Sequence, residues 1–300
     1  MDNIKIRFKN RFSSPRLVAE YIFRKTCGRW MPSKLYLSIL YRINFGSKMH
    51  WKHPQTFNEK LTWCKLYDRR KHYTMLADKY AVKSYVAERI GKDYVVENYG
   101  VWDKWEDIDL DTLPNQFVLK CTHDSGGAFI CHDKTTFDKE RVGNMIKRNL
   151  HKNLFYSMRE WPYKNIPPRI IADRFLDDHT GAELRDYKWW CFNGKPQFMY
   201  CTIKGDNLYE NFYDMDFNPV AINHGFPRHQ PEFEKPQNFE LMKGLASKLS
   251  SDIPFVRVDF FDVDGHVYFG EFTFYDWAGM QPFADDWDAM LGEYMQLPTK

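Results

Sequence analysis

The fold of this chain is decided by one segment, Val256-Arg257-Val258-Asp259-Phe260-Phe261-Asp262-Val263-Asp264-Gly265-His266-Val267-Tyr268-Phe269-Gly270-Glu271-Phe272-Thr273. It contains two runs of β-branched and aromatic residues joined by Asp-Gly, a pattern typical of a β-hairpin. Each run holds one carboxylate among apolar residues, Asp259 in the first and Glu271 in the second. Burial of such a charge is costly unless it is paired or binds a metal. The hairpin is therefore either a candidate metal site or an exposed edge hairpin with two unrelated acids.

The length of the turn determines whether the two carboxylates share a face of the hairpin. A three-residue loop over 263–265 would place Arg257 opposite Glu271. It would also place Asp259 opposite Phe269, diagonal to Glu271 and within reach of a shared ion. A two-residue loop would put the carboxylates on opposite faces, because side chains alternate along a strand. A shared metal therefore requires a loop with an odd number of residues or a β-bulge.

The composition indicates a soluble globular protein. The 300 residues suit one large domain or two closely packed ones, with 43% hydrophobic and 28% charged residues. No apolar run approaches the roughly 20 residues that span a bilayer, and no secretory signal is visible. The six cysteines contain no C-x-x-C pair, so we expect buried thiols in a reducing compartment. These features predict a cytoplasmic protein.

Positive charge is concentrated at the N-terminus. Residues 1–60 contain 13 Lys and Arg but only three acids, whereas the whole chain has a net charge of +3. The segment also has helical periodicity. It could pack on the main domain, rest on the inner face of an anionic membrane, or bind a polyanion. We expect no nucleic-acid partner, because no nucleic-acid module accompanies the basic residues.

A lysine and a glycine-rich loop follow one another in the middle of the chain. Residues 117–121 form an apolar strand that contains Lys120, and Ser125-Gly126-Gly127 lies between it and a second strand at 128–131. Glycines let backbone N–H groups approach phosphate oxygens, and an ammonium group supplies charge. The order differs from that of a P-loop, because the lysine precedes the glycines. The alternative is an ordinary hairpin turn.

The remaining patterns predict alternating helices and strands. Pro167-Pro168 marks a boundary, and Asn193-Gly194 predicts a hairpin turn. We expect helices over 76–90, 139–156 and 236–249, a short strand near 94–96, and further strands over 169–176, 185–192, 195–200, 211–213 and 220–222.

The order of these parts resembles the ATP-grasp fold, and within it the TupA-like family, which is associated with teichuronopeptide and capsular polysaccharide synthesis. The resemblance runs from about residue 35 to residue 279, through Pro54-Gln55-Thr56-Phe57-Asn58-Glu59-Lys60, Ala77-Asp78-Lys79, Phe117-Val118-Leu119-Lys120, Tyr187-Lys188 and Phe269-Gly270-Glu271. It implies an α+β fold in which two α/β lobes clamp ATP. The expected parts are a basic helical segment (1–75), a small lobe (76–168) and a large lobe (169–300).

The resemblance also implies roles for individual residues. ATP would be bound by Lys79, Lys120, Ser125, Gly126, Gly127, Asp173 on the hinge strand, and Asp177 or Asp178 near the ribose. Mg²⁺ would be held by Asp259 and Glu271, with Thr273 where many ATP-grasp enzymes have an asparagine ligand. A second Mg²⁺ position is therefore in doubt. Lys188 and Arg257 would be catalytic, facing the terminal phosphates and the transferred group.

The function implied is an ATP-dependent carboxylate–amine ligase. It would join an amine or amino acid to a uronic-acid carboxylate of a surface polysaccharide through an acyl phosphate. One alternative is a glycosyltransferase that uses 214–216 or 262–264 as a D-x-D metal site, although acids are common at turns for local reasons. A non-catalytic polysaccharide-binding module is a third interpretation, suggested by the 17% aromatic content.

Overall fold

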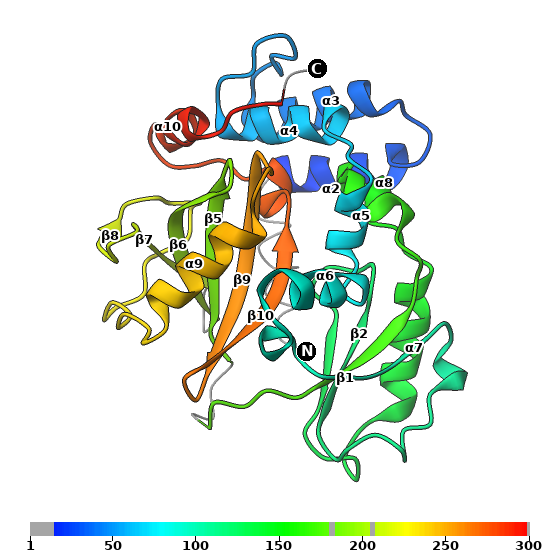
Figure 1. Cartoon of the computed structure of the whole chain (residues 1–300). Coiled ribbons are helices and arrows are strands. Elements are labelled where there is room, and N and C mark those ends of the chain that lie inside the picture. Colours follow the sequence, from blue (N-terminus) through cyan, green and yellow to red (C-terminus); the bar gives the residue numbers. More distant parts are fainter. Residues whose placement is uncertain (1–14, 180–183, 205–207, 299–300) are drawn as a thin grey trace.

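The computed structural model describes residues 15–179, 184–204 and 208–298 (Figure 1). Two antiparallel sheets lie side by side, and a layer of helices covers one end of both. The small sheet has the strand order β1-β4-β2-β3, and the large sheet has the order β10-β9-β5-β6-β7-β8. The strands are β1 (Asn98–Trp102), β2 (Phe117–Cys121), β3 (Ala128–Cys131), β4 (Ile170–Arg174), β5 (Asp186–Phe192), β6 (Lys195–Lys204), β7 (Leu208–Tyr213), β8 (Pro219–Val220), β9 (Phe255–Val263) and β10 (His266–Thr273).

The helices α2, α3, α4 and α10 form a layer at one end of the molecule, which we call the end layer (Figure 1). The helices α7 and α9 pack against the sheets. The α-helices are α2 (Pro15–Cys27), α3 (Ser33–Phe45), α4 (Phe57–Tyr67), α5 (His72–Ala77), α6 (Ala81–Ile90), α7 (Lys139–Leu150), α8 (Phe155–Met158), α9 (Phe239–Leu249) and α10 (Trp287–Tyr294). Short 3₁₀ helices are η1 (Lys92–Tyr94), η2 (Trp105–Asp107), η3 (Trp161–Asn165) and η4 (Asp276–Gly279). Among the described residues, none of these helices combines the length and the apolar character needed to cross a membrane.

The small sheet has one apolar face and one charged face. Phe117, Leu119 and Ala172 are buried in a core cluster that includes Ile146 of α7. Because side chains alternate along a strand, Lys120 and its neighbours point to the other face. The apolar face is thus covered by α7, and the charged face is left for binding.

The large sheet also has one face packed in a hydrophobic core, and this core is larger than that of the small sheet. Trp189 packs on Phe239 of α9, with ring centroids 4.9 Å apart. Residues of the opposite face pair across β5, β9 and β6: Lys188 lies opposite Asp259 and also opposite Tyr200. Trp190 contacts Phe57 of α4. The helical layer therefore closes one end of the large sheet.

The helical layer is built into the main core. A capping box begins α4, in which Thr56 accepts from the backbone of Glu59 and Glu59 accepts from the backbone of Thr56. Phe57 and Leu61 then enter the same buried cluster as the large sheet. The helices α2 and α3 pack on this layer through a smaller cluster around Tyr36 and Leu40.

Several predicted elements are confirmed and others need correction. The strands at 117–121 and 128–131 and the Asn193-Gly194 turn are confirmed. The predicted helix over 76–90 is wrong as one piece, because Asp78 accepts bonds from the N–H groups of Tyr80 and Ala81 and starts a new helix there. The strand expected near 94–96 is the 3₁₀ helix η1 followed by an isolated bridge from Val95 to Phe269. The helix expected over 139–156 ends at Leu150.

The carboxylate hairpin has a different register from the three-residue-loop alternative. His266 pairs with Val263, so the turn holds only Asp264 and Gly265, both with positive φ. The register then shifts between Phe269 and Phe272, which places Thr273, not Glu271, opposite Arg257. A β-bulge therefore replaces the odd loop as the device that brings the carboxylates together. A Cβ at Gly270 would lie 3.1 Å from the backbone oxygen of Asp259, so the bulge favours a glycine there.

Candidate active site

Arg257 is the centre of a buried charge cluster on the polar face of the large sheet. Its guanidinium makes two 2.7 Å bonds to the carboxylate of Asp259. The Nη2 atom also lies 3.4 Å from Glu271, while Nη1 donates to Asp276. One guanidinium thus draws three carboxylates together from β9, β10 and η4.

The electrostatics of the cluster favour an additional cation. Burial raises the pKa of Asp259 to about 6, and the neighbouring Arg257 opposes that shift without cancelling it. Burial alone would lower the pKa of Arg257, but Asp259, Tyr200 and Asp276 outweigh it and raise the pKa. Arg257 therefore stays charged, and one arginine does not fully compensate for the desolvation of Asp259.

Lys79 joins the small lobe to this cluster. Its ammonium donates to the backbone oxygen of Asp124 and lies 4.0 Å from the carboxylate of Glu271. Its own N–H donates to the oxygen of Thr122 at 3.1 Å. The break between α5 and α6 turns Lys79 toward the glycine loop, so the predicted lysine, loop and metal carboxylate meet.

The glycine loop connects β2 and β3 and is open at its tip. Ser125 donates its N–H to Asp124 Oδ1 at 2.8 Å. Gly126 has a φ of +78°, and a Cβ added there would meet no atom within 4 Å, whereas a Cβ at Gly127 would lie 3.0 Å from Asp124 Oδ2. The backbone of Ser125, Gly126 and Gly127 can therefore approach a ligand more closely than larger residues would allow.

Lys120 shares a buried carboxylate with a lysine that the sequence analysis did not identify. Asp173 lies 3.2 Å from Lys120 and 3.0 Å from Lys83 of α6, and Asn98 donates to it as well. Burial alone would raise the pKa of Asp173, but Lys120 and Lys83 outweigh it and lower the pKa. Asp173 therefore orients Lys120 and presents no open carboxylate. No local pattern marked Lys83, because a lysine in a helix ordinarily faces solvent.

Lys188 and Thr273 lie on the large sheet beside the Arg257 cluster. Lys188 donates to Asp186 at 3.0 Å and to Thr202 at 3.2 Å, and its backbone pairs with Asp259. Thr273 pairs with Arg257 across the hairpin. The register therefore brings both predicted residues to the same face as Asp259.

Asp177 lies away from this cluster. It accepts the N–H of His179 at 2.8 Å, in the connection that follows β4. The ring of His179 lies 3.9 Å from Asp264 in the turn of the β9–β10 hairpin. The structure therefore places Asp177 toward the turn of the hairpin and does not bring it together with Lys79 and Glu271.

The alternative D-x-D sites have local roles instead. Asp214 accepts bonds from the N–H groups of Asp216 and Asn218 and from the side chain of Asn218. Asp262 accepts from Asn238 at 3.0 Å, and Asp264 occupies the hairpin turn. These acids stabilise turns, which weakens the case for a glycosyltransferase metal site.

The residues present fit a magnesium ion that is bound together with a nucleotide. In the part of the chain that the structure describes, no group of three or more His, Cys, Asp or Glu could hold a metal. Asp259 and Glu271, joined through one nitrogen of Arg257, supply two carboxylate ligands. Mg²⁺ commonly uses one or two carboxylates and completes its shell with phosphates and water. Hence the protein supplies part of a site that a phosphate ligand would complete.

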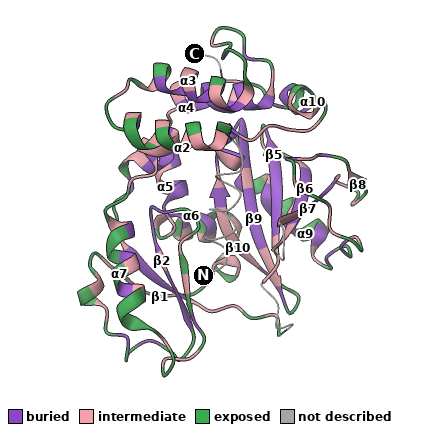
Figure 2. Cartoon of the chain, turned by 180° about the vertical axis from the view of Figure 1, so that it is seen from behind, coloured by how far each residue is buried: buried purple, intermediate pink, exposed green. Residues whose placement is uncertain are grey.

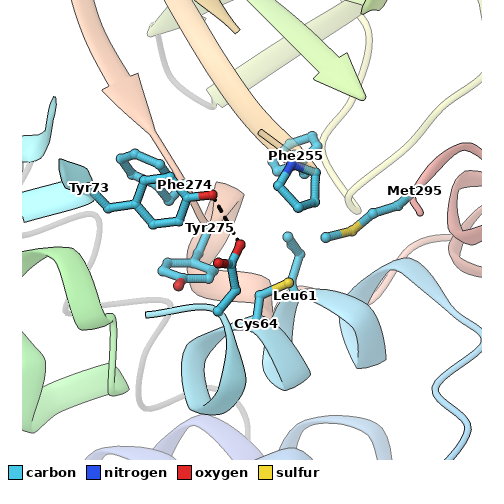
Figure 3. A pocket seen from close by; sticks show the side chains of 9 residues that line it. Leu61, Cys64, Tyr73, Phe255, Phe274, Tyr275 and Met295 are labelled. Carbon is cyan, nitrogen blue, oxygen red and sulfur yellow. Dashed lines mark hydrogen bonds between the residues drawn. The ribbon is translucent and has the colours of Figure 1, made fainter. Parts of the chain in front are cut away.

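A small cavity below the large sheet is a packing void. It lies among Leu61, Cys64, Phe274 and Tyr275, near the bond from the Tyr73 hydroxyl to Asp68 (Figure 3). Its volume of about 10 Å³ is roughly the space that one water molecule needs. This cavity is too small for a nucleotide or sugar.

The two sheets bring lysines, a glycine loop and a carboxylate pair together, as expected of an ATP-grasp protein. The family model described as TupA-like ATPgrasp matches residues 59–296, and the chain belongs to that family. The fold class expected from the sequence is thereby confirmed. A search of curated proteins found no significant match.

Solved structures with detectable similarity include ATP-grasp proteins. The D-alanine–D-alanine ligase of Bacillus anthracis complexed with ATP is 17% identical, with a TM-score of 0.38, over 66% of this chain and 55% of that one. A RimK domain ATP-grasp protein from Sphaerobacter thermophilus is 11% identical, with a TM-score of 0.42, over 74% of this chain and 69% of that one. The ATP-grasp ligase PsnB, complexed with minimal precursor, Mg and ADP, is 8% identical with a TM-score of 0.39, over 72% of this chain and 57% of that one. The chain thus spans little more than half of the first of these.

Proposed function

We propose that the protein is an ATP-dependent ligase that joins a carboxylate to an amine. The observation that carries this proposal is the Arg257 cluster, in which Asp259 and Glu271 meet within reach of Lys79. Such an arrangement offers positive charge and oxygen ligands to the β- and γ-phosphates of a nucleotide. Phosphoryl transfer needs positioning and charge neutralisation more than a protein nucleophile.

The reaction that fits these residues has two steps. An acceptor carboxylate oxygen attacks the γ-phosphorus, and the bond to the β-phosphate oxygen breaks, which yields an acyl phosphate and ADP. An amine then attacks the acyl carbon, phosphate leaves, and the amine loses a proton. Mg²⁺, when bound, would neutralise the phosphate charge. Arg257 and Lys188 would stabilise the transferring group, while Lys79, Lys120 and the loop 125–127 hold the remaining phosphates.

The acceptor class is also part of the proposal. Family membership supports a uronic-acid carboxylate on an acidic glycan, with an amino acid or simple amine as the second substrate. An acidic glycan would be attracted by exposed lysines and arginines, and its binding should weaken with salt.

Nucleotide chromatography tests the reaction. The protein is incubated with Mg²⁺-ATP, oligouronates and an amine panel, and we expect ADP and phosphate whose release requires carboxylate and amine together. Mass spectrometry should find the adduct that has lost one water. AMP with pyrophosphate, or sugar transfer from a nucleotide sugar without ATP, would overturn the proposal.

A further inference from the structure

The end layer of helices presents large apolar side chains to solvent. Trp30, Ile22 and Leu35 have 70%, 54% and 52% of their surface exposed, respectively. Ile22, Thr26 and Trp30 are spaced four residues apart along α2 and its C-terminal turn. The indole nitrogen of Trp30 donates to the oxygen of Thr26 at 2.9 Å. The polar atom of the indole is thus satisfied, and its exposed surface is apolar. Figure 2 shows the exposed residues along α2.

The turn that carries Trp30 is held rigidly from behind. The buried guanidinium of Arg159 donates to the oxygens of Gly28 and Met31, on either side of Arg29 and Trp30. A Cβ at Gly28 would lie 2.5 Å from the backbone oxygen of Tyr156, so the turn packs directly on neighbouring backbone. Trp30 therefore projects from a fixed support.

Basic residues lie close to the apolar ones along the chain, in α2, α3 and the turn between them. Residues 15–48 contain seven Lys and Arg and one acid, Glu20. Lys25, Arg29 and Lys34 are exposed, and among the described residues none of them forms an ion pair with a carboxylate. Instead Lys25 lies over Tyr21, Arg29 over Tyr156 and Lys34 over Trp51. A patch of this kind combines apolar area with uncompensated positive charge.

We propose that this patch, made of Ile22, Lys25, Arg29, Trp30, Lys34 and Leu35, binds the surface of an anionic lipid membrane. Interfacial segments place Trp and Leu at the acyl boundary and Lys and Arg among the headgroups. Anionic lipids attract each nearby basic residue. A soluble acidic glycan would use the charges and could stack a sugar on Trp30, but it would have no use for the two exposed aliphatic side chains. Because the patch lies in the end layer, both sheets remain free of the membrane. The inference does not rest on the proposed ligase activity.

The test is vesicle sedimentation with the full chain. Vesicles of phosphatidylcholine alone are compared with vesicles of equal parts phosphatidylglycerol and phosphatidylcholine. We expect binding to the anionic vesicles only, and release by high salt. Lys25→Gln/Arg29→Gln/Lys34→Gln should weaken binding roughly five-fold per charge removed, and Ile22→Ser/Trp30→Ser should weaken it as well. The matched controls are Leu241→Ser/Met290→Ser, which also removes exposed apolar side chains, and Lys139→Gln/Lys147→Gln.

Each other occupant of the patch gives a distinct result. If Ile22→Ser/Trp30→Ser binds anionic vesicles as well as the wild type does, the exposed apolar side chains do not contribute to membrane binding and the proposal is wrong. Binding to a soluble oligouronate that depends on the three basic residues, without vesicle binding, would identify a glycan site instead. Self-association in sedimentation velocity that is abolished by Ile22→Ser/Trp30→Ser, again without vesicle binding, would identify a second copy of the chain. In the membrane case, anionic vesicles should shift the tryptophan emission of the wild type to the blue and leave that of Ile22→Ser/Trp30→Ser unchanged.

Discussion

Lys65, a fully buried lysine of α4, donates its ammonium to the backbone oxygen of Ala278 in η4. Ala278 and the preceding Trp277 have φ values of +56° and +46°, a left-handed conformation that is unfavourable for residues other than glycine. The turn begins with Asp276, which binds Arg257 and also accepts from Trp190. Lys65 thus holds a strained turn whose first residue positions the central arginine.

Replacement of Lys65 should therefore affect turnover more than ATP binding. For Lys65→Met we expect kcat to fall roughly 10- to 100-fold, because small displacements of a positioned group carry large costs. The KM for ATP should change by less than about three-fold, since the lysines that we propose as phosphate ligands are untouched. Steady-state kinetics on the folded variant measures both.

Lys60 provides the matched control for this prediction. It lies on the same helix and also donates to backbone oxygens, those of Gly292 and Met295, both at 2.8 Å. Lys60→Met should lower thermal stability and leave kcat close to the wild-type value. Equal losses of kcat in both variants would mean that Lys65 acts only through general stability.

Glu271→Gln should preserve the fold and remove most ATP turnover. Glu271 has 37% of its side chain exposed and contributes no core packing, so the neutral isostere should be tolerated. Loss of the carboxylate that we propose as a metal ligand should lower turnover on the order of 100-fold. The exposed Glu240→Gln on α9 is the control. Wild-type turnover in Glu271→Gln, measured by ADP release, would exclude Glu271 from the metal site.

Local sequence patterns predicted the strands and the separate functional residues, but not all of their geometry. The strands 117–121 and 128–131 were predictable because each is an apolar run and a glycine-containing turn separates them. The only local indication of the bulge at Gly270 was the presence of a glycine inside a strand. The two-residue turn moves the pairing by one residue from that of the assumed three-residue loop, and the bulge moves it by one more, so the pairing deduced from that loop was wrong along the whole hairpin.

Other parts of the site depend on distant contacts that no local pattern reveals. Asp276 lies in an irregular turn, and its role depends on Arg257, Trp190 and Tyr200 from three strands. Lys65 follows a helical pattern in which a lysine would ordinarily face solvent. Lys65 is buried because η4, a turn distant in sequence, packs on α4, and the local sequence does not indicate that contact.

Lys120→Ala should weaken nucleotide binding. A charge-assisted hydrogen bond to a phosphate contributes about 1.5–3 kcal/mol, so ATP affinity should fall roughly 10- to 150-fold. Lys83 still pairs with Asp173 in the variant, and the small sheet should remain folded. Calorimetric titration with Mg²⁺-ATP gives the affinity, with the exposed Lys139→Ala as control. Unchanged affinity in a folded Lys120→Ala protein would show that Lys120 is not a ligand.

Asp173 should make stability depend on pH in the acid range. Lys120 and Lys83 lower its pKa in the folded protein in spite of burial, so the unfolded chain binds the proton more readily. The stabilisation is therefore complete above the unfolded value of about 3.9, and it is lost as pH falls through the lower folded value.

Denaturant unfolding of wild type and Asp173→Asn over a pH series measures this contribution. At neutral pH the variant leaves two lysines without their shared carboxylate, and we expect it to be less stable by about 3–5 kcal/mol. The difference should shrink as pH falls below about 3.9, because the wild-type carboxylate also becomes neutral. The exposed Asp216→Asn should show only a small difference throughout. A gap between wild type and Asp173→Asn that stays constant down to the lowest pH would show that the two lysines do not stabilise the charged carboxylate.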